Sequence, residues 1–243
     1  MTYSLGLFSK VLETTVKADW HEKHKMLRIS FAAGVKAGRA DCEIQFGHIN
    51  RSTKSNTRTE QAQIEMAAHK WVSLSQPGLN FALLNDCKYG YSIRDNIIEL
   101  NALRGTDYPA DNLDFGEHTF RYGIYADDGR DLCQTVRQGY LFNIAPVMVP
   151  VESAAGELPA EHSFITLDSK QVIIDGVKKA EESDSLVVRT YEASGAPDGV
   201  RVNANLATKV ISLCDLTERK TGEVSGEIEY KPFEIVSLLL NEV

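Results

Sequence analysis

Residues 78–91 of the chain read GLNFALLNDCKYGY, an apolar run that ends abruptly in polar and aromatic side chains. The run formed by Phe81, Leu83 and Leu84 is too short for a helix and predicts a buried β-strand. The seven residues after it bring an amide, a carboxylate, an ammonium and two phenols to the end of that strand. Sugars are bound by such a mixture, since polar groups bond the hydroxyls and aromatic rings pack against the C–H faces. A plain polar turn is the alternative interpretation.

Alternation of apolar and polar residues predicts more strands along the chain. Residues 26–31 place Leu27, Ile29 and Phe31 opposite Arg28 and Ser30, which is the period of a half-buried strand. The same reasoning predicts strands at residues 42–46, 97–103, 119–125, 163–167, 186–191, 200–206 and 234–240. Turn signals separate them at residues 33–34, 77–78, 127–129, 175–176 and 197–199. Short strands at this spacing predict an all-β protein of antiparallel β-sandwich type.

Two segments depart from the strand pattern. Residues 131–142 space their apolar side chains three or four apart, which predicts one short helix. The stretch 147–161 contains small residues, a glycine and two prolines, which is typical of a linker. We therefore expect a main β-sandwich at residues 1–147, a linker at 148–161 and a smaller β unit at 162–243.

Composition restricts the partners and the compartment. The 243 residues carry a net charge of −8, and no basic stripe that could neutralise phosphates, which argues against nucleic acid. No window approaches the length of a membrane span, and the first ten residues are too weakly apolar for a signal peptide. The four cysteines are scattered without CxxC spacing, so we expect free thiols and a cytoplasmic location.

Six blocks of the sequence, in order, resemble the C-terminal region of glycoside hydrolase family 38, the α-mannosidases, in its branch of bacterial and cytosolic members. The blocks are DWHEKHK (19–25), EIQFGH (43–48), AHKWV (68–72), LLNDCKYGY (83–91), DFGEHTF (114–120, a weaker match) and KPFEI (231–235). They cover nearly the whole chain. The chain departs from the family at residues 51–60, where the family's usual proline, histidine and tryptophan are absent.

The resemblance implies an accessory role. Family members look like retaining α-mannosidases that use an aspartate nucleophile, an aspartate acid and a zinc ion held by histidine and aspartate. All of these belong to an N-terminal domain that nothing in this sequence resembles. We therefore expect no catalytic residue, no zinc ligand and no cofactor in this chain, with zinc in a catalytic domain that is missing here. The resemblance also implies that the main sandwich is truncated at its N-terminal edge, because the family's sheet begins upstream of residue 19.

In the family, loops of the β domains help to close the cleft around the substrate. On that basis we predict contacts with substrate or with another domain at Asn85, Asp86, Lys88, Tyr89 and Tyr91. The expected partners are an α-mannoside and either the catalytic domain of the same enzyme or another copy of the chain. A stand-alone carbohydrate-binding module, with the tyrosines and Trp71 as platforms, is the alternative, as is a domain that serves interaction alone.

Other polar groups carry weaker signals. Two further strand ends are polar, and they contain Gln45, His48 and Arg51 in one case and Glu65, His69, Lys70 and Trp71 in the other. We expect Trp71 to fill the core rather than bind sugar. His21 and His24 are three apart on a predicted strand, where they face opposite sides, so a zinc pair is disfavoured. Retaining hydrolysis needs two carboxylates about 5 Å apart, and none of Asp86, Asp107, Asp114 and Glu117 has a context that marks it.

Overall fold

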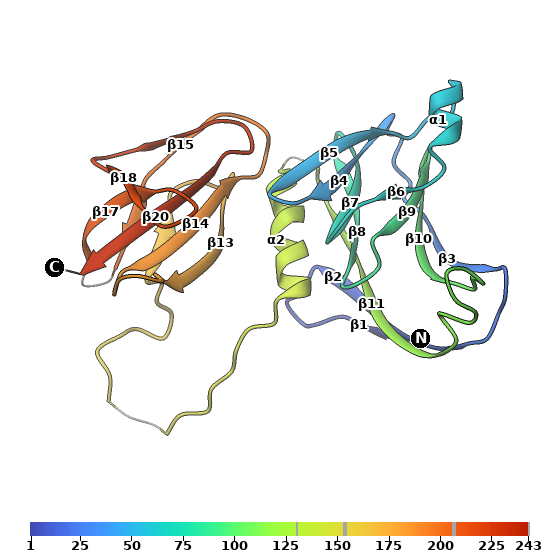
Figure 1. Ribbon diagram of the computed structural model, residues 1–243, viewed down its shortest axis with the longest axis horizontal. Coiled ribbons are helices and arrows are strands. Elements are labelled where there is room, and N and C mark those ends of the chain that lie inside the picture. The colour runs from blue at the N-terminus through green and yellow to red at the C-terminus, as the bar shows by residue number, and fades with distance from the viewer. Residues whose placement is uncertain (130, 153–154, 206–207, 243) are drawn as a thin grey trace. The chain divides into compact units, whose positions relative to one another are not determined.

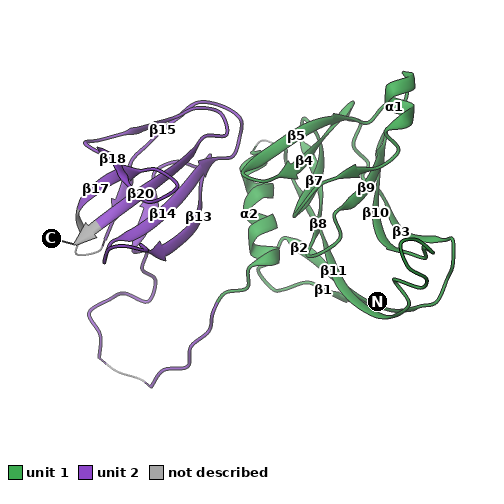
Figure 2. Cartoon of the chain, viewed as in Figure 1, with its two compact units in different colours: residues 1–146 green, residues 147–243 purple. Residues whose placement is uncertain are grey.

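The computed structural model describes residues 1–129, 131–152, 155–205 and 208–242. The chain divides into two compact units, Met1–Pro146 and Val147–Val243 (Figure 2). Almost all regular structure is antiparallel strand, which confirms the predicted fold class (Figure 1).

The first unit is a sandwich of two sheets. The larger sheet has the strand order β1 (Thr2–Ser4), β2 (Val11–Trp20), β11 (Gly116–Asp127), β8 (Leu79–Asn85), β7 (Trp71–Gln76), β4 (Arg39–Ile44) and β5 (Gly47–Ser52). The smaller sheet has the order β3 (Met26–Ala32), β10 (Ile97–Arg104), β9 (Gly90–Arg94) and β6 (Met66–Ala67). Side chains from both sheets, among them Val72 and Leu83 from the larger and Ile98 and Leu100 from the smaller, form one core.

Strand β8 is buried on both of its faces, which explains its continuous apolar sequence. Leu83 points into the core between the sheets. The neighbouring Leu84 is equally buried although it points the other way. Helix α2 (Leu132–Asn143) lies against β7, β8 and β11 and covers that outer face. The run therefore shows no alternation because both sides of the strand meet apolar neighbours.

The second unit contains a five-stranded sheet and two short ribbons. The sheet has the order β13 (Val172–Lys179), β14 (Leu186–Glu192), β20 (Ile235–Glu242), β17 (Thr208–Cys214) and β18 (Lys220–Glu223). The ribbons pair β12 (Ile165–Leu167) with β16 (Val202–Ala204) and β15 (Asp198–Val200) with β19 (Ile228–Tyr230). A separate core, which includes Val188, Tyr230 and Leu238, joins these pieces.

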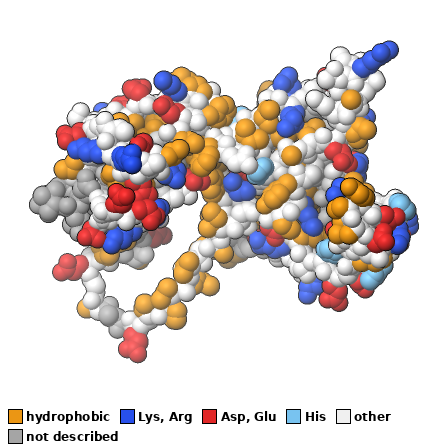
Figure 3. All heavy atoms as spheres, viewed as in Figure 1, with side chains coloured by type: hydrophobic (Ala, Val, Ile, Leu, Met, Phe, Trp, Pro, Cys, Tyr) orange, Lys and Arg blue, Asp and Glu red, His pale blue; other side chains and the backbone are white. Residues whose placement is uncertain are grey.

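The segment that follows α2 carries exposed apolar side chains. Val147, Met148, Val149 and Val151 are all exposed, and hydrophobic side chains follow one another along this segment in Figure 3. Among the residues described between α2 and β12, none belongs to a helix or strand.

Three local predictions need correction. A second helix, α1 (Arg58–Ala62), was not expected; it buries no residue and so has no apolar period. Residues 175–176 form an irregularity within β13 rather than a turn. In β4 the alternation fails at Glu43, which is 2% exposed. A buried ion pair, described below, keeps this carboxyl group inside.

Candidate contact site at the ends of three strands

Asn85 is the structural centre of the turn that follows β8. Its side chain has no exposed surface. Nδ2 donates to the carbonyl oxygen of His69 at 2.6 Å and to the hydroxyl of Tyr91, while Oδ1 accepts from the backbone N–H of Lys88 at 2.7 Å. A single buried amide therefore holds the start of β7, the turn and β9 together, with both donors and the acceptor in use.

Asp86 connects the turn to β11. Its carboxylate accepts from the backbone N–H of Arg121 at 3.1 Å and from Nε of the same residue at 3.2 Å. The guanidinium also contacts Glu13 at 3.4 Å and donates to the carbonyl oxygen of Phe142 at 3.0 Å. Asp86 is therefore one member of a charge cluster that ties β2, β8, β11 and the end of α2 together.

Lys88 and Tyr89 of the turn each contact an aromatic ring, but the two contacts differ in kind. The ammonium of Lys88 lies 5.1 Å from the ring centroid of the buried Phe120, a cation–π contact. The ring of Tyr89 stacks on the ring of His69, with centroids 5.3 Å apart and an interplanar angle of 22°. Tyr89 is 50% exposed, so its other surface faces solvent.

The five residues predicted as contacts thus fall into two groups. Asn85 and Tyr91 are fully buried and position the turn, whereas Asp86, Lys88 and Tyr89 have exposed surface. Burial raises the pKa of the Tyr91 hydroxyl, so this group stays neutral. Burial also raises the pKa of the Cys87 thiol within the same turn to about 11, and the hydrogen bond to Asp86 adds to the shift. A thiol with such a pKa is protonated at neutral pH and is a poor nucleophile.

The structure brings two of the separate polar strand ends to this turn. Gln45 follows β4 and His69 precedes β7, and their Nε2 atoms are 3.3 Å apart. We call the surface formed by Gln45, His69 and Tyr89 the Tyr89 platform. Its members are 20 or more positions apart in sequence, and only the pairing of β4 with β7 and of β6 with β9 makes them neighbours.

A buried ion pair lies next to the platform. Nζ of Lys70 is 2.7 Å from Oε1 of Glu43 and 4.5 Å from the ring centroid of Tyr140 on α2. The backbone N–H of Lys70 donates to the same carboxylate. Burial raises the pKa of Glu43, and the hydrogen bond from Lys70 opposes that shift. The Glu43 side chain is 3% exposed and the Lys70 side chain 27%, so the carboxylate is buried while part of the lysine side chain reaches the surface. The pair holds the strand ends in place.

Other residues with predicted or conceivable roles are placed elsewhere. Trp71 is fully buried, as expected for a core residue, and the ring of His48 on β5 packs near it at 6.2 Å between centroids. His21 bonds Asp19 at 2.8 Å and His24 bonds Asp107 at 2.9 Å, each within its own pair. Within the described part of the chain, no three His, Cys, Asp or Glu residues form a group that could hold a metal ion.

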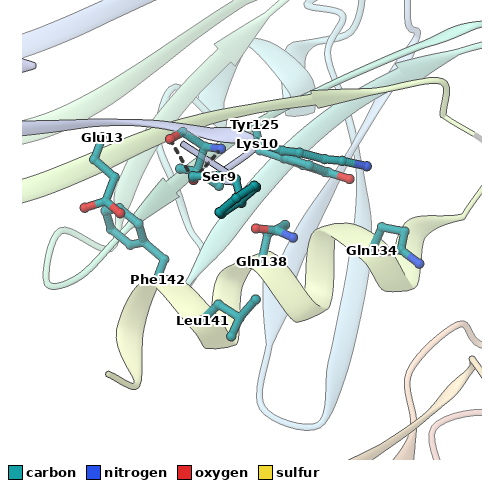
Figure 4. A pocket seen from close by; sticks show the side chains of 10 residues that line it. Ser9, Lys10, Glu13, Tyr125, Gln134, Gln138, Leu141 and Phe142 are labelled. Carbon is teal, nitrogen blue, oxygen red and sulfur yellow. Dashed lines mark hydrogen bonds between the residues drawn. The ribbon is translucent and has the colours of Figure 1, made fainter. Parts of the chain in front are cut away.

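A cavity of about 270 Å³ lies between the start of β2 and helix α2 (Figure 4). Gln134, Gln138 and Leu141 line it from the helix, and Ser9 and Lys10 line it from the opposite side. Glu13 is the acidic residue of its lining, and Arg121 already binds that carboxylate. A single, paired carboxylate does not supply the two acidic groups that glycoside hydrolysis requires.

Comparison with known proteins identifies the family. The profile of the glycosyl hydrolases family 38 C-terminal domain matches residues 2–112, and that of the family 38 C-terminal beta sandwich domain matches residues 171–238. The chain belongs to glycosyl hydrolase family 38, as a C-terminal β-sandwich region. The sequence resemblance is thereby confirmed.

Similar proteins in this family are α-mannosidases. Human alpha-mannosidase 2C1 is 37% identical over an alignment of 236 residues, and the alignment covers 92% of this chain and 22% of the relative. Alpha-mannosidase G of Dictyostelium discoideum is also 37% identical, over 92% of this chain and 21% of its own length. This family 38 chain therefore spans about a fifth of the length of these relatives.

Solved structures of the family share the fold. The crystal structure of an alpha-mannosidase from Enterococcus faecalis V583 matches with a TM-score of 0.83 and 17% identity. The match covers 96% of this chain and 28% of that one.

In the described residues of this family 38 chain, no helix is long and apolar enough to cross a bilayer.

Proposed function

We propose that this chain is the accessory C-terminal β region of an α-mannosidase, and that the catalytic centre lies in another part of the enzyme. The observation that carries the proposal is the match to curated α-mannosidases over 92% of this chain but 22% of the human relative. Hydrolysis by a retaining enzyme needs a carboxylate pair about 5 Å apart. Asp86 of the predicted turn and Glu13 on β2 are both bound to Arg121, and Glu43 beside the turn is paired with Lys70, so these carboxylates are held in structural ion pairs.

The proposal assigns a place to each expected partner. The substrate is a terminal α-mannoside, and zinc is held by the catalytic domain and not by this chain. The protein partner of this chain is the catalytic domain of the same enzyme or another copy of the chain. The exposed part of the turn, Asp86, Lys88 and Tyr89, contributes contacts at the edge of the cleft. A cytoplasmic location fits the four free cysteines, and the net charge of −8 fits the absence of a nucleic-acid partner.

A chimera tests the accessory role. The matching 236-residue region of human alpha-mannosidase 2C1 is replaced by this chain, and hydrolysis of an aryl α-mannoside is compared with that of the human enzyme truncated before the region. We expect the chimera to regain activity that the truncated enzyme lacks. A chimera that folds, as judged by its oligomeric state and thermal unfolding, but is no more active than the truncated form would contradict the proposal.

The isolated chain provides the complementary measurement. We expect it to release no aryl leaving group from the same α-mannoside, with or without added zinc, because the proposal places the carboxylate pair and the metal in the other part of the enzyme. Turnover that copurifies with the chain through successive columns would show that the catalytic residues lie within it.

A stand-alone carbohydrate-binding module remains the second candidate. The observation that favours it is the 50% exposure of Tyr89 together with the stack of its ring on His69, because a ring held in this way offers an ordered aromatic surface to a sugar. Among the aromatic residues named for that role, Trp71 and Tyr91 are fully buried, so Tyr89 has to carry it.

A further inference from the structure

The Tyr89 platform has the form of a rigid, one-sided aromatic surface. One face of the Tyr89 ring is fixed by the stack on His69, and half of the residue's surface stays open to solvent. The backbone around the ring is fixed as well, because Ala68 donates its N–H to the carbonyl oxygen of Tyr89 at 3.1 Å. On the other side of the stack, His69 donates its N–H to the carbonyl oxygen of Glu43 at 3.1 Å.

Asn85 holds both halves of this stack in one arrangement. Its Nδ2 bonds the carbonyl oxygen of His69, and its Oδ1 accepts from Lys88, the residue before Tyr89. The amide is fully buried, so these bonds do not compete with water. A ligand that stacks on Tyr89 therefore meets a surface that is ordered before it binds, which lowers the entropic cost of association.

The polar groups beside the open ring are neutral or neutralised. Nε2 of Gln45 is paired with Nε2 of His69 at 3.3 Å, which leaves one N–H and the oxygen of the Gln45 carboxamide for a ligand. The charged neighbours are already engaged: Lys70 with Glu43, and Asp86 with Arg121. This environment suits an uncharged ligand that presents both hydroxyls and a flat C–H face, and a pyranose ring has both features.

We propose that the Tyr89 platform is a saccharide-binding site for a hexopyranose, with the Tyr89 ring against the C–H face of the sugar, Gln45 on its hydroxyls and His69 holding both side chains in place. The inference rests on the proposed function only in the choice of mannose as the hexose. It makes this region a direct sugar contact, in addition to its role as a scaffold.

The test uses the full 243-residue chain and follows ¹H–¹⁵N spectra while methyl α-D-mannopyranoside is added. We expect saturable shifts centred on residues 45, 69 and 89. Mannitol, which carries similar hydroxyls on a flexible chain without a fixed C–H face, should give no saturable shift at the same concentrations. Tyr89→Ala should weaken binding by about tenfold or more, and Tyr89→Phe should retain the ring contact.

Two further variants separate local loss from damage to the fold. Tyr108→Ala removes another exposed tyrosine, 84% exposed in the loop between β10 and β11, and should bind the mannoside like the unaltered chain. Gln45→Ala removes the hydroxyl-binding amide without touching the turn and should weaken binding several-fold. The thermal unfolding midpoint of each variant is measured alongside.

The results of these titrations either support or contradict the proposed sugar site. Saturable binding that is lost in Tyr89→Ala and kept in Tyr108→Ala supports the site. Absence of saturable shifts in the unaltered chain, survival of binding in a folded Tyr89→Ala variant, or equal binding of mannitol would each overturn it. The chimera described above reports the accessory role separately: an active chimera with no sugar binding to the isolated chain removes the platform and leaves the proposed function in place.

Discussion

At the scale of single residues, the turn after β8 depends on a buried amide. Asn85 satisfies three groups from three different segments, and water cannot replace them because the side chain has no exposed surface. The residue that looked in sequence like the first of a row of ligand contacts is therefore the one that orders the others. All the hydrogen bonds of its side chain are made inside the protein, and they fix the position of Tyr89 at the surface.

Replacing Asn85 should destabilise the first unit strongly. Asn85→Ala leaves the Tyr91 hydroxyl and two backbone groups without their partner, which we expect to lower the free energy of unfolding by about 3 kcal/mol. Urea unfolding followed by tryptophan fluorescence measures this unit alone, because Trp20 and Trp71 are the two tryptophans of the chain. Gln61→Ala, at an exposed amide with a bond to the carbonyl oxygen of Ser55, is the matched control and should change stability by less than about 0.5 kcal/mol. Equal effects of the two changes would remove the structural role given to Asn85.

The buried carboxyl group of Glu43 should give the first unit a distinctive pH dependence. Its pKa is raised in the folded protein above the ordinary value of 4.5, with burial as the main cause. The stability that this group contributes is therefore complete below pH 4.5 and is lost as the pH rises through the raised pKa. In Glu43→Gln this dependence disappears, so the stability of the unaltered protein relative to the variant should fall as pH increases across that window.

Paired urea titrations of both proteins over a series of pH values measure the difference. Only the difference is informative, since surface carboxylates act in the opposite direction. For example, the hydrogen bond from Lys178 lowers the pKa of Glu218, and its contribution is lost on acidification. A difference that grows with pH would mean that the pair with Lys70 outweighs the burial of Glu43.

At the scale of elements, helix α2 is fixed against the larger sheet by a glycine. A Cβ at Gly139 would lie 2.7 Å from Cδ1 of Trp71, closer than side chains approach one another. The glycine lets the helix lie on the indole ring, and Asn143 then donates to the carbonyl oxygens of Gly139 and Asn85 at 2.9 and 3.0 Å. Because Gly139 lets α2 approach Trp71 closely, Asn143 on the helix can bond Asn85 at the start of the turn after β8.

Gly139→Ala should destabilise the first unit although alanine favours helices by about 1 kcal/mol over glycine. The clash with Trp71 exceeds that gain, and we expect a net loss of about 1–3 kcal/mol together with a shift in tryptophan emission. Gly38→Ala is the matched control, since no atom lies within 4 Å of its added Cβ, and it should be neutral or slightly stabilising. A stabilised Gly139→Ala variant would show that α2 moves freely over the sheet.

The small helix α1 is stabilised by its ends and not by burial. The side chain of Thr57 accepts from the N–H of Glu60, and the Glu60 carboxylate accepts from the N–H of Thr57 at 2.9 Å. This capping box lies in the stretch where the sequence departs from its family. A helix of this kind has no apolar stripe, which is why the hydrophobic pattern gave no sign of it.

At the scale of the whole molecule, each unit has a hydrophobic core of its own. The core of the first unit is built from the two sheets of the sandwich, and that of the second from the five-stranded sheet and its ribbons. In the second unit a buried carboxylate, Glu192, also accepts from the backbone N–H groups of Gly195 at 2.8 Å and Phe233 at 3.0 Å. Each core, with its buried polar groups, is formed by residues of a single unit.

We therefore expect residues 147–243 to fold when produced alone. The isolated unit should show a cooperative thermal transition by far-ultraviolet circular dichroism, because its core and polar anchors are complete without residues 1–146. Glu192→Ala in that unit should lower the midpoint by removing the acceptor of these bonds. A gradual change of ellipticity without a transition would contradict the independence of the second unit.

The amino-acid sequence by itself determined the fold class, the helix at α2 and the burial of β8. These features are local, because alternation, a continuous apolar run and helical spacing are each contained within about a dozen neighbouring residues. The family was also identified from short sequence blocks such as LLNDCKYGY.

Only the tertiary structure decided which strand ends meet and which of their side chains remain exposed. Gln45, His69 and Tyr89 became one surface through the pairing of β4 with β7 and of β6 with β9, while Tyr91 went to the core two positions from an exposed tyrosine. Strand pairing depends on the packing of whole sheets. Tyr91 lies within β9, which the sandwich covers, whereas Tyr89 precedes that strand, so the point where the strand begins, which no local pattern records, separates a core residue from an exposed one.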